Sequence, residues 1–182
     1  MTWTKRLKTK VCLVGEQMVG KTSLVRRCVQ NEFDDRYITT LGVKTSKKEL
    51  TLQFPGKSRM EVHLLIWDFM GQEGFRELLK DAYFIGARGI LAVADLTRRP
   101  TLEALGPWIE TVRSVAGNVP LVLAINKADL SGQAVYSDEE LSRFAATYDA
   151  PFIRTSAKTG ANVEAAFGRL ATVVAERYMD LP

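Results

Sequence analysis

The sequence predicts an α/β fold, in which helices pack on both faces of a mostly parallel sheet. The main observation is that short β-rich apolar runs alternate with amphipathic stretches, a pattern typical of strands joined by crossover helices. The second observation is length, because 182 residues are close to the ordinary size of one domain. We therefore expect a single domain over residues 1–182.

Six apolar runs have the length and composition of β-strands. They are Lys8–Val14, Lys48–Phe54, Glu61–Asp68, Ile90–Asp95, Leu121–Asn126 and Phe152–Thr155. Pro55-Gly56, between the second and third runs, predicts a hairpin turn. One pair of strands at the edge of the sheet is therefore expected to be antiparallel.

Helical spacing of apolar residues lies between these strands. The first predicted helix runs from Lys21 to about Asn31, and the last from about Val163 to Tyr178. We expect the buried face of the first helix to consist of Leu24, Val25, Cys28 and Val29.

Two further helices are predicted in the second half of the chain. Ser137, with Glu140 three residues later, forms the pattern of a capping box at a helix start. The stretch Thr101–Val115 has helical spacing, but Gly106-Pro107 interrupts it. We expect a kink or a late start there, because proline lacks the N–H that a helix interior requires.

Composition excludes several classes of protein. With 46% apolar and 25% charged residues, the chain is neither disordered nor fibrous. The longest apolar runs are too short to span a membrane, and no secretory signal follows the N-terminus, so we expect a cytoplasmic protein. The net charge of +4 is explained by a solvated surface, with weak attraction to an anionic surface or a nucleic acid as the alternative, so charge decides little; we expect no nucleic-acid partner. Cys12 and Cys28 lie in apolar patterns and are expected to be reduced core thiols.

A phosphate-binding motif lies between the first strand and the first helix. Gly15 to Thr22 reads G-x-x-x-x-G-K-T, directly after an apolar strand and before a helix, as this motif requires. Backbone N–H groups of such a loop bind phosphate oxygens, the lysine reaches the β- and γ-phosphates, and the threonine binds Mg²⁺. The alternative, a turn without a ligand, gives no reason for Lys21 and Thr22. The predicted nucleotide-binding residues here are Gly15, Glu16, Gln17, Met18, Val19, Gly20, Lys21, Thr22 and Ser23.

A second polar group follows the run Glu61–Asp68. Asp68 stands at the carboxyl end of a strand, where ligands bind in open α/β sheets, and its carboxylate can hold Mg²⁺ through water. Gly71 can bring its N–H close to a terminal phosphate, and the amide of Gln72 can orient a water for attack. The alternative is a surface turn.

The loops after the last two strands suit a guanine base. Asp129, in Asn126-Lys127-Ala128-Asp129, can accept hydrogen bonds from N1–H and N2–H₂ of guanine, which adenine lacks. The stem of Lys127 can lie along the ring. The segment Thr155-Ser156-Ala157-Lys158 can direct a backbone N–H at the base oxygen, although by itself it reads as an ordinary loop. The predicted base-binding residues are Asn126, Lys127, Asp129, Ser156, Ala157 and Lys158.

Taken together, in this order and each after a strand, these motifs resemble the Ras superfamily of small GTPases, most closely its Rab and Ras-like members. The resemblance covers roughly residues 9–178. It implies the three-layer sandwich of P-loop nucleoside triphosphatases, with six strands. It also implies GTP and GDP as ligands with Mg²⁺, hydrolysis of GTP, and a switch that effector, exchange-factor and GTPase-activating proteins read.

The resemblance also assigns residues. Residues 37–43 resemble the first switch, which makes Thr40 a second protein ligand of Mg²⁺ and Tyr37 a nucleotide-binding residue. Phe33 corresponds to the aromatic residue that packs against guanine, and residues 68–75 to the second switch. The metal site implied is Thr22, Thr40 and Asp68, and the catalytic residues implied are Lys21, Thr40 and Gln72.

Several positions depart from the family pattern. Gln17 and Met18 are larger than is common in the phosphate loop, and they crowd the place where a helper protein's arginine enters. We therefore expect slow hydrolysis without an activating protein. Gly74 stands where arginine is common in the second switch. No cysteine ends the chain, so we expect no prenyl group, no stable membrane anchor and a soluble monomer.

Three alternatives remain open. The chain can be a GTP-binding interaction scaffold with little or no hydrolysis, which timed phosphate release would distinguish. An ATP-using kinase shares the phosphate loop but leaves Asn126 to Asp129 unexplained. Arg36, four residues before Thr40, can serve as a catalytic arginine within the chain, although a solvated surface position explains it better.

Overall fold

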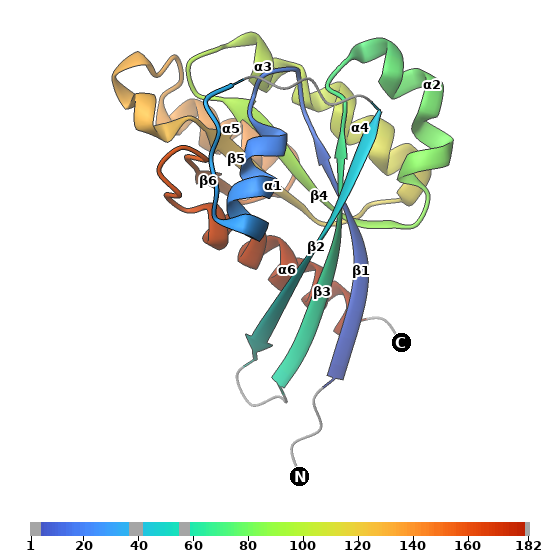
Figure 1. Ribbon diagram of the computed structural model, residues 1–182. Helices are drawn as coiled ribbons and strands as arrows, with labels where there is room; N and C mark the ends of the chain where they lie inside the picture. Colours follow the sequence, from blue (N-terminus) through green and yellow to red (C-terminus); the bar gives the residue numbers. More distant parts are fainter. Residues whose placement is uncertain (1–4, 37–41, 55–58, 181–182) are drawn as a thin grey trace.

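A six-stranded sheet in the order β2-β3-β1-β4-β5-β6 forms the centre of the computed structural model. β2 pairs antiparallel with β3, and every other neighbouring pair is parallel. Helices lie on both faces of the sheet (Figure 1). The structure describes residues 5–36, 42–54 and 59–180, apart from the side chains of residues 73, 75, 76, 78 and 79. The predicted three-layer α/β sandwich with one antiparallel edge strand is confirmed.

All six predicted strands are present, with some differences at their ends. They are β1 Lys5–Val14, β2 Val43–Gln53, β3 Arg59–Phe69, β4 Ala87–Asp95, β5 Leu121–Asn126 and β6 Phe152–Arg154. β2 begins at Val43, well before the predicted Lys48, and pairs from there with Phe69 of β3. The early part of β2 is polar, so backbone pairing rather than apolar periodicity defines it. The predicted turn at Pro55-Gly56 lies outside the described residues.

The helices are α1 Lys21–Gln30, α2 Glu73–Phe84, α3 Pro100–Glu103, α4 Leu105–Ala116, α5 Asp138–Thr147 and α6 Val163–Met179, with a 3₁₀ helix at Ala128–Gln133. The capping box is confirmed, since Ser137 and Glu140 exchange side-chain and backbone hydrogen bonds at the start of α5. Sequence reasoning missed α2, because it assigned the first residues of this helix, up to Phe75, to the second switch; Gly74 lies inside this helix.

The predicted helix Thr101–Val115 is indeed divided, but at a different place. The break falls at Ala104, so Pro107 lies in the first turn of α4. The N–H groups of a first turn have no partner within the helix, so a proline there removes no hydrogen bond. The prediction of a break at Gly106-Pro107 was therefore wrong by a few residues.

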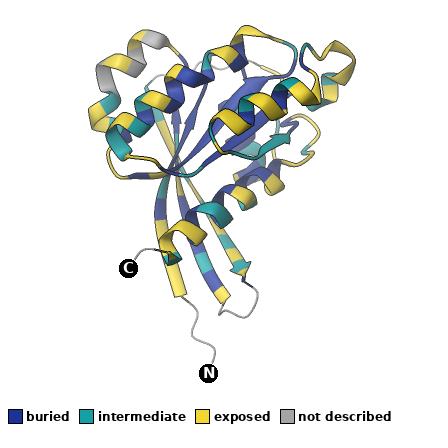
Figure 2. Ribbon diagram, turned by 180° about the vertical axis from the view of Figure 1, so that it is seen from behind, coloured by how far each residue is buried: buried dark blue, intermediate teal, exposed yellow. Residues whose placement is uncertain are grey.

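Two apolar clusters lie on opposite faces of the sheet. One contains residues of α1 and α6, and the other contains residues of α2, α3, α4 and α5. Between them, β4, β5 and the second half of β1 are almost wholly buried (Figure 2), whereas β2 and β6 contain no buried residue. Cys12 and Cys28 are buried free thiols, and burial raises the pKa of each to about 12. Val29, predicted on the buried face of α1, is 39% exposed and lies outside both clusters.

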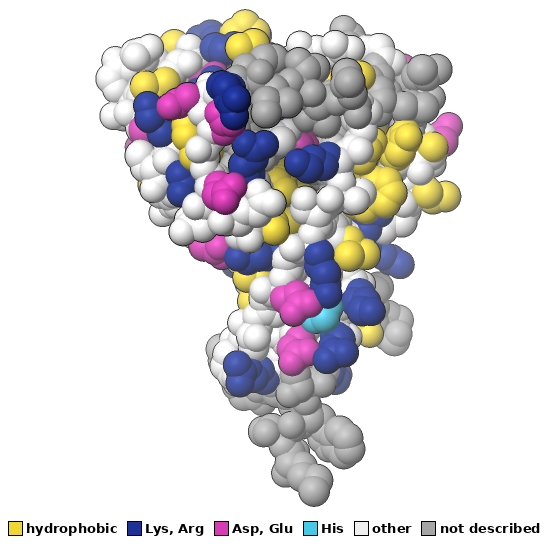
Figure 3. Space-filling view, in the orientation of Figure 1, with side chains coloured by type: hydrophobic (Ala, Val, Ile, Leu, Met, Phe, Trp, Pro, Cys, Tyr) yellow, Lys and Arg dark blue, Asp and Glu magenta, His cyan; other side chains and the backbone are white. Residues whose placement is uncertain are grey.

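Charged side chains gather on the lower part of the sheet in Figure 3. Arg6 of β1 forms an ion pair with Glu61 of β3, and Lys47 and Glu49 of β2 form another. This surface is therefore of mixed charge. Within the described part of the chain, no helix is both long and apolar enough to cross a bilayer.

Candidate functional site

The loops at the carboxyl ends of the strands enclose a cavity of about 350 Å³. Its walls come from the phosphate loop, the start of α1, the segments 33–36 and 69–71, and the loops after β5 and β6. The predicted residues that line it are Gln17, Met18, Gly20, Lys21, Thr22, Ser23, Phe33, Gly71, Asn126, Lys127, Asp129, Ala157 and Lys158. Segments far apart in the sequence thus form one site. Tyr37 and Thr40 lie outside the described residues.

The phosphate loop requires glycine at both of its ends. Gly15 has a φ of 141° and Gly20 a φ of 99°, a region that other residues rarely adopt. A Cβ atom at Gly15 would come within 2.2 Å of the Val93 carbonyl oxygen, and one at Gly20 within 2.3 Å of Asn126 Nδ2. Close packing against β4 and β5 therefore fixes the shape of this loop.

Lys21 is folded back over the phosphate loop. Its Nζ atom donates to the carbonyl oxygens of Gly15, at 2.7 Å, and Glu16, at 2.9 Å. Burial lowers the pKa of Lys21 to about 8, although the Asp68 and Glu16 carboxylates oppose this shift. The ammonium group is thus held at the floor of the cavity by two neutral acceptors.

Thr22 and Asp68 form a group of oxygen atoms beside the cavity. The Thr22 hydroxyl donates to Asp68 Oδ2, and Asp68 is buried at 1% exposure. Burial raises the pKa of this carboxyl, although the Thr22 hydroxyl and the nearby lysines oppose the shift. Among the described residues, Asp68 Oδ1 has no hydrogen-bond partner. A buried oxygen without a partner is costly, and Mg²⁺ prefers oxygen ligands, so these residues fit that ion.

The segment after β3 lies directly on the phosphate loop. A Cβ atom at Gly71 would come within 2.6 Å of the Gln17 nitrogen, so only glycine fits there without displacement. The N–H of Met70 donates to the carbonyl of Gly42, which links this segment to the end of the first switch. Gln72 is exposed at the start of α2 and is not part of the cavity wall. Its catalytic role stays a prediction.

At the other end of the cavity, Asn126 joins three loops. Its Nδ2 donates to the Val19 carbonyl at 2.9 Å, and its Oδ1 accepts from the Thr155 hydroxyl and the Ala157 N–H at 3.2 and 3.3 Å. Asn126 is therefore a structural link between the phosphate loop and the base loop. Sequence reasoning placed it at the site but did not foresee these partners.

Two charged residues of this end, Lys127 and Asp129, are paired with other side chains. Lys127 Nζ lies 2.6 Å from Asp95 Oδ2, and the Ser156 hydroxyl donates to Asp129 Oδ1 at 2.6 Å. Ser156 is fully buried, so it supports Asp129 from behind. The carboxylate that is predicted to read the base is thereby held in place before any ligand arrives.

Sequence reasoning missed three supporting residues. Asp95 pairs with Lys127, Arg27 donates to the Ala157 and Lys158 carbonyls at 2.8 and 2.6 Å, and Trp108 donates to the Glu16 carboxylate at 3.1 Å. Asp95 ends a buried strand at the carboxyl edge of the sheet, which is the same signal that identified Asp68. No signal in the sequence identifies Arg27 or Trp108, because their partners are distant loops.

Arg36 lies at the rim of the cavity and is held by a neighbour. Its guanidinium group donates to both carboxylate oxygens of Asp34, at 3.1 and 2.8 Å, and its side chain is 85% exposed. These hydrogen bonds lower the pKa of Asp34 to about 2. This arrangement agrees with a solvated surface position and gives no support to catalysis by Arg36.

Comparison with known proteins agrees with this geometry. The model of the Ras family matches residues 10–176. Ras-related protein Rab-1D of Dictyostelium discoideum is 36% identical over 173 residues, which cover 94% of this chain and 82% of that protein. GTP-binding protein YPTM2 of Zea mays is 35% identical over 174 residues, which cover 95% of this chain and 83% of that protein. The chain thus belongs to the Ras family: it is a Rab-like small GTPase, an enzyme that acts as a nucleotide-dependent switch.

Proposed function

We propose that the cavity binds GTP or GDP together with Mg²⁺, and that partner proteins read the segments 37–43 and 68–75. The observation that carries this proposal is the convergence of a phosphate loop and a base loop, far apart in the sequence, on one cavity. Asp68 Oδ1, which lacks a hydrogen-bond partner among the described residues, and the Thr22 hydroxyl, which donates to the other oxygen of that carboxylate, support the metal.

Guanine would be selected at the Asp129 end. The carboxylate accepts hydrogen bonds from the N1–H and N2–H₂ groups of guanine, whereas adenine presents no donor at either position. Ser156 holds Asp129 in place, so the geometry does not have to be built when the base arrives. A base that leaves this carboxylate unpaired is strongly penalised.

Hydrolysis would proceed by in-line attack of water on the γ-phosphorus, with GDP as the leaving group. Lys21 exchanges its two carbonyl partners for phosphate oxygens and stabilises the charge that develops there. Thr22, Asp68 and Thr40 would hold Mg²⁺, which supplies positive charge to the phosphates when bound. Gln72 and the Thr40 carbonyl would orient the attacking water.

We expect this reaction to be slow in the isolated protein. Met18, 53% exposed at the cavity wall, and Gln17 fill space above the phosphate loop, and Arg36 is engaged with Asp34. An arginine supplied by a partner contributes roughly 10³ to 10⁵ in rate. A GTPase-activating protein would therefore control turnover. We further propose that the protein acts as a monomer in the cytoplasm, in agreement with its free buried thiols.

Mass spectrometry of the nucleotide that co-purifies with the protein tests ligand identity. Release of phosphate from GTP bound in a single turnover, with and without cell extract, then tests the reaction. We expect bound GDP or GTP and slow release that the extract accelerates. Guanine nucleotide retained without any release under either condition would favour the scaffold, and a preference for ATP would contradict the proposal.

A further inference from the structure

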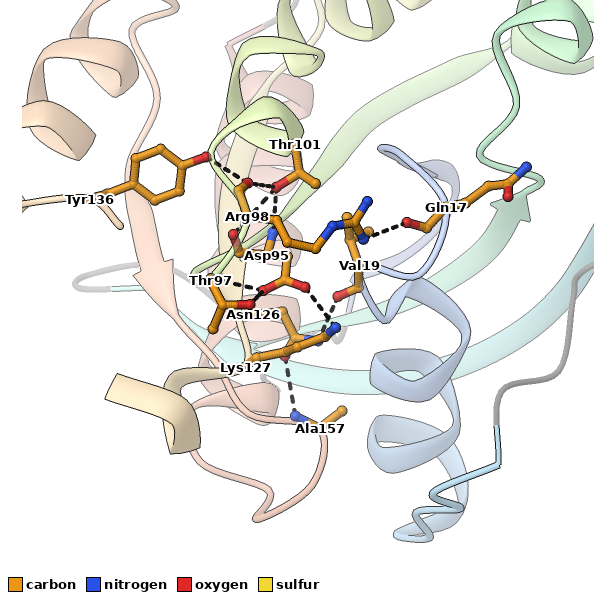
Figure 4. A network of polar contacts seen from close by, with 10 residues as sticks. All are labelled: Gln17, Val19, Asp95, Thr97, Arg98, Thr101, Asn126, Lys127, Tyr136 and Ala157. Atoms are coloured by element: carbon orange, nitrogen blue, oxygen red, sulfur yellow. Dashed lines mark hydrogen bonds and ion pairs between the residues drawn. The ribbon is translucent and has the colours of Figure 1, made fainter. Parts of the chain in front are cut away.

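The turn that follows β4 lies between the two ends of the cavity, yet it supplies none of the residues that line it. Figure 4 shows this turn, residues 95–101, with side chains that point toward both ends. Its charged residues are Asp95, Arg98 and Arg99, of which Asp95 and Arg98 face the cavity loops. Asp95 and Arg98 each contact a loop that the proposed function places against the nucleotide.

Asp95 contacts the base end. It is fully buried, and its Oδ2 lies 2.6 Å from Lys127 Nζ. Its Oδ1 accepts from the N–H and the hydroxyl of Thr97, at 2.9 and 2.7 Å. Burial by itself would raise the pKa of Asp95, but the hydrogen bonds from Lys127 and Thr97 bring it below its ordinary value. The carboxylate is therefore charged at neutral pH and holds the Lys127 ammonium in place.

Arg98 contacts the phosphate end. Its Nη1 donates to the Gln17 carbonyl at 3.0 Å. Because a trans peptide is planar, a carbonyl that points toward Arg98 directs the next N–H, that of Met18, to the opposite side. The contact thus fixes the orientation of one peptide group in the loop whose N–H groups bind phosphate.

The Thr101 hydroxyl connects the backbones of Asp95 and Arg98. The Thr101 hydroxyl accepts from the Asp95 N–H at 2.9 Å and donates to the Arg98 carbonyl at 2.7 Å. The Tyr136 hydroxyl also donates to the Arg98 carbonyl, at 2.8 Å. Thr101 is buried, so water does not compete for these hydrogen bonds. The turn is a rigid link between its two contacts.

We propose that Asp95 and Arg98 are positioning residues, which set the base loop and the phosphate loop at a fixed separation from each other. Asp95 acts on guanine recognition through Lys127, and Arg98 acts on the phosphates through the Gln17 peptide. Neither residue lines the cavity that would hold the nucleotide. The inference rests on the proposed function, because it needs a nucleotide that spans the cavity.

The test at the base end uses Asp95→Asn, which keeps the shape of the side chain but removes its charge. Lys127 then loses its ion-pair partner, and the loop that carries Asp129 is released. We expect the dissociation constant of GDP to rise about tenfold or more. We also expect the preference for GDP over inosine diphosphate, which lacks the 2-amino group, to fall about threefold or more.

Thr97→Val is a milder variant that still tests the proposal if Asp95→Asn does not fold. It removes only the hydroxyl that donates to Asp95 and keeps the carboxylate. The preference for GDP over inosine diphosphate should shift in the same direction by a smaller factor. Circular dichroism checks the fold of both variants, and competition with a fluorescent GDP measures both nucleotides.

The test at the phosphate end compares Arg98→Ala with Arg99→Ala. Arg99 is the adjacent arginine, but it contacts Glu140 and Val135 rather than the phosphate loop, so it is a matched control. We expect Arg98→Ala to slow single-turnover hydrolysis of bound GTP by about three- to tenfold, with an unchanged preference between GDP and inosine diphosphate. Arg99→Ala should leave both quantities within about twofold of the unmodified protein.

The outcomes separate the inference from the function on which it rests. If the unmodified protein binds no guanine nucleotide, the proposed function fails. If it binds and hydrolyses normally, but Asp95→Asn and Thr97→Val discriminate against inosine diphosphate as the unmodified protein does, the role of Asp95 is wrong. Equal hydrolysis rates in Arg98→Ala and Arg99→Ala would remove the role of Arg98.

Discussion

The two ends of the cavity differ in how their polar groups are satisfied. At the base end, Lys127 is paired with Asp95, and Asp129 with Ser156. At the phosphate end, Lys21 is bound to carbonyls of its own loop, and one oxygen of Asp68 has no partner among the described residues. Lys127 and Asp129 of the base end thus have protein partners without a ligand. At the phosphate end, Lys21 has partners that a bound phosphate would replace, and Asp68 has an oxygen that a ligand would satisfy.

This difference indicates which end recognises and which end switches. A preformed base end costs little to engage, so under the proposed function it would provide affinity and specificity for guanine. At the phosphate end, Lys21 must exchange partners and Asp68 must acquire a ligand, so the state of this end depends on which phosphates are present. Under the proposed function this segment would transmit that state, because Gly71 lies against the phosphate loop and the Met70 N–H donates to the Gly42 carbonyl.

The largest effect is expected for Asp129→Asn, which tests whether the base end recognises guanine. An amide can accept only one of the two guanine hydrogen bonds, and its NH₂ group faces the other donor. We expect the dissociation constant of GDP to rise about 100-fold or more, and that of xanthosine diphosphate, which has a carbonyl at position 2, to fall. Competition titrations measure both. An unchanged preference would show that Asp129 does not read the base.

Gln72→Leu tests the phosphate end through catalysis. Leucine cannot orient a water, so single-turnover hydrolysis should slow by about tenfold or more, with the affinity for GTP nearly unchanged. Phosphate release and equilibrium titration give the two quantities separately. Undiminished release would remove Gln72 from the mechanism.

Thr22→Asn tests the metal side of the same end. Loss of the hydroxyl beside Asp68 should weaken GTP about tenfold more than GDP, because GTP carries more charge for the metal to neutralise. The measurement is a titration of each nucleotide in the presence and in the absence of Mg²⁺. Equal losses for the two nucleotides would count against Thr22 as a metal ligand.

The pH dependence of binding sharpens the assignment of Lys21. Its pKa is about 8 in the free protein, and bound phosphates raise that pKa, so binding takes up a proton above pH 8. Affinity for GDP should be flat below that pH and fall above it, by at most about tenfold per pH unit. Calorimetry in buffers of different ionisation enthalpy detects this proton. The Lys21→Met variant should not take up this proton when it binds GDP. Proton uptake that persists in this variant would have to be assigned to another group.

Arg27→Lys is the smallest of these changes and acts at the base end. Lysine keeps the charge but cannot donate to the Ala157 and Lys158 carbonyls in the forked geometry of arginine. We expect GDP to dissociate about two- to fivefold faster, with single-turnover hydrolysis unchanged. Stopped-flow release of a fluorescent GDP measures the rate. A larger effect on hydrolysis than on release would assign Arg27 to the phosphate end.

The fold followed from the sequence where local pattern and tertiary packing agree. The apolar strand Leu121–Asn126 and the capping box at Ser137 were predicted with their observed limits because each is defined by neighbouring residues. The start of β2 was missed because pairing with β3 defines it more than its own periodicity does, and α2 was missed because its first residues were assigned to the second switch.

The residues of the site also fall into those that the sequence predicts and those that it does not. Motifs located most of the residues that line the cavity, since phosphate and guanine chemistry demand particular side chains at particular spacings, whereas Arg26, Asp34, Asp35 and Leu130 line it without having been predicted. Asp95, Arg27 and Trp108 could not be found in this way, because they act through loops that are remote in sequence. Tyr37 and Thr40 lie outside the described residues, so their roles stay predictions.

Calorimetry on protein freed of nucleotide tests the central claim most directly. In the presence of Mg²⁺, we expect one GDP to bind per chain with a dissociation constant well below about 1 μM, and ADP to give no detectable binding at the same concentration. Absence of heat with GDP, or equal affinity for ADP, would contradict recognition of a guanine nucleotide by this cavity.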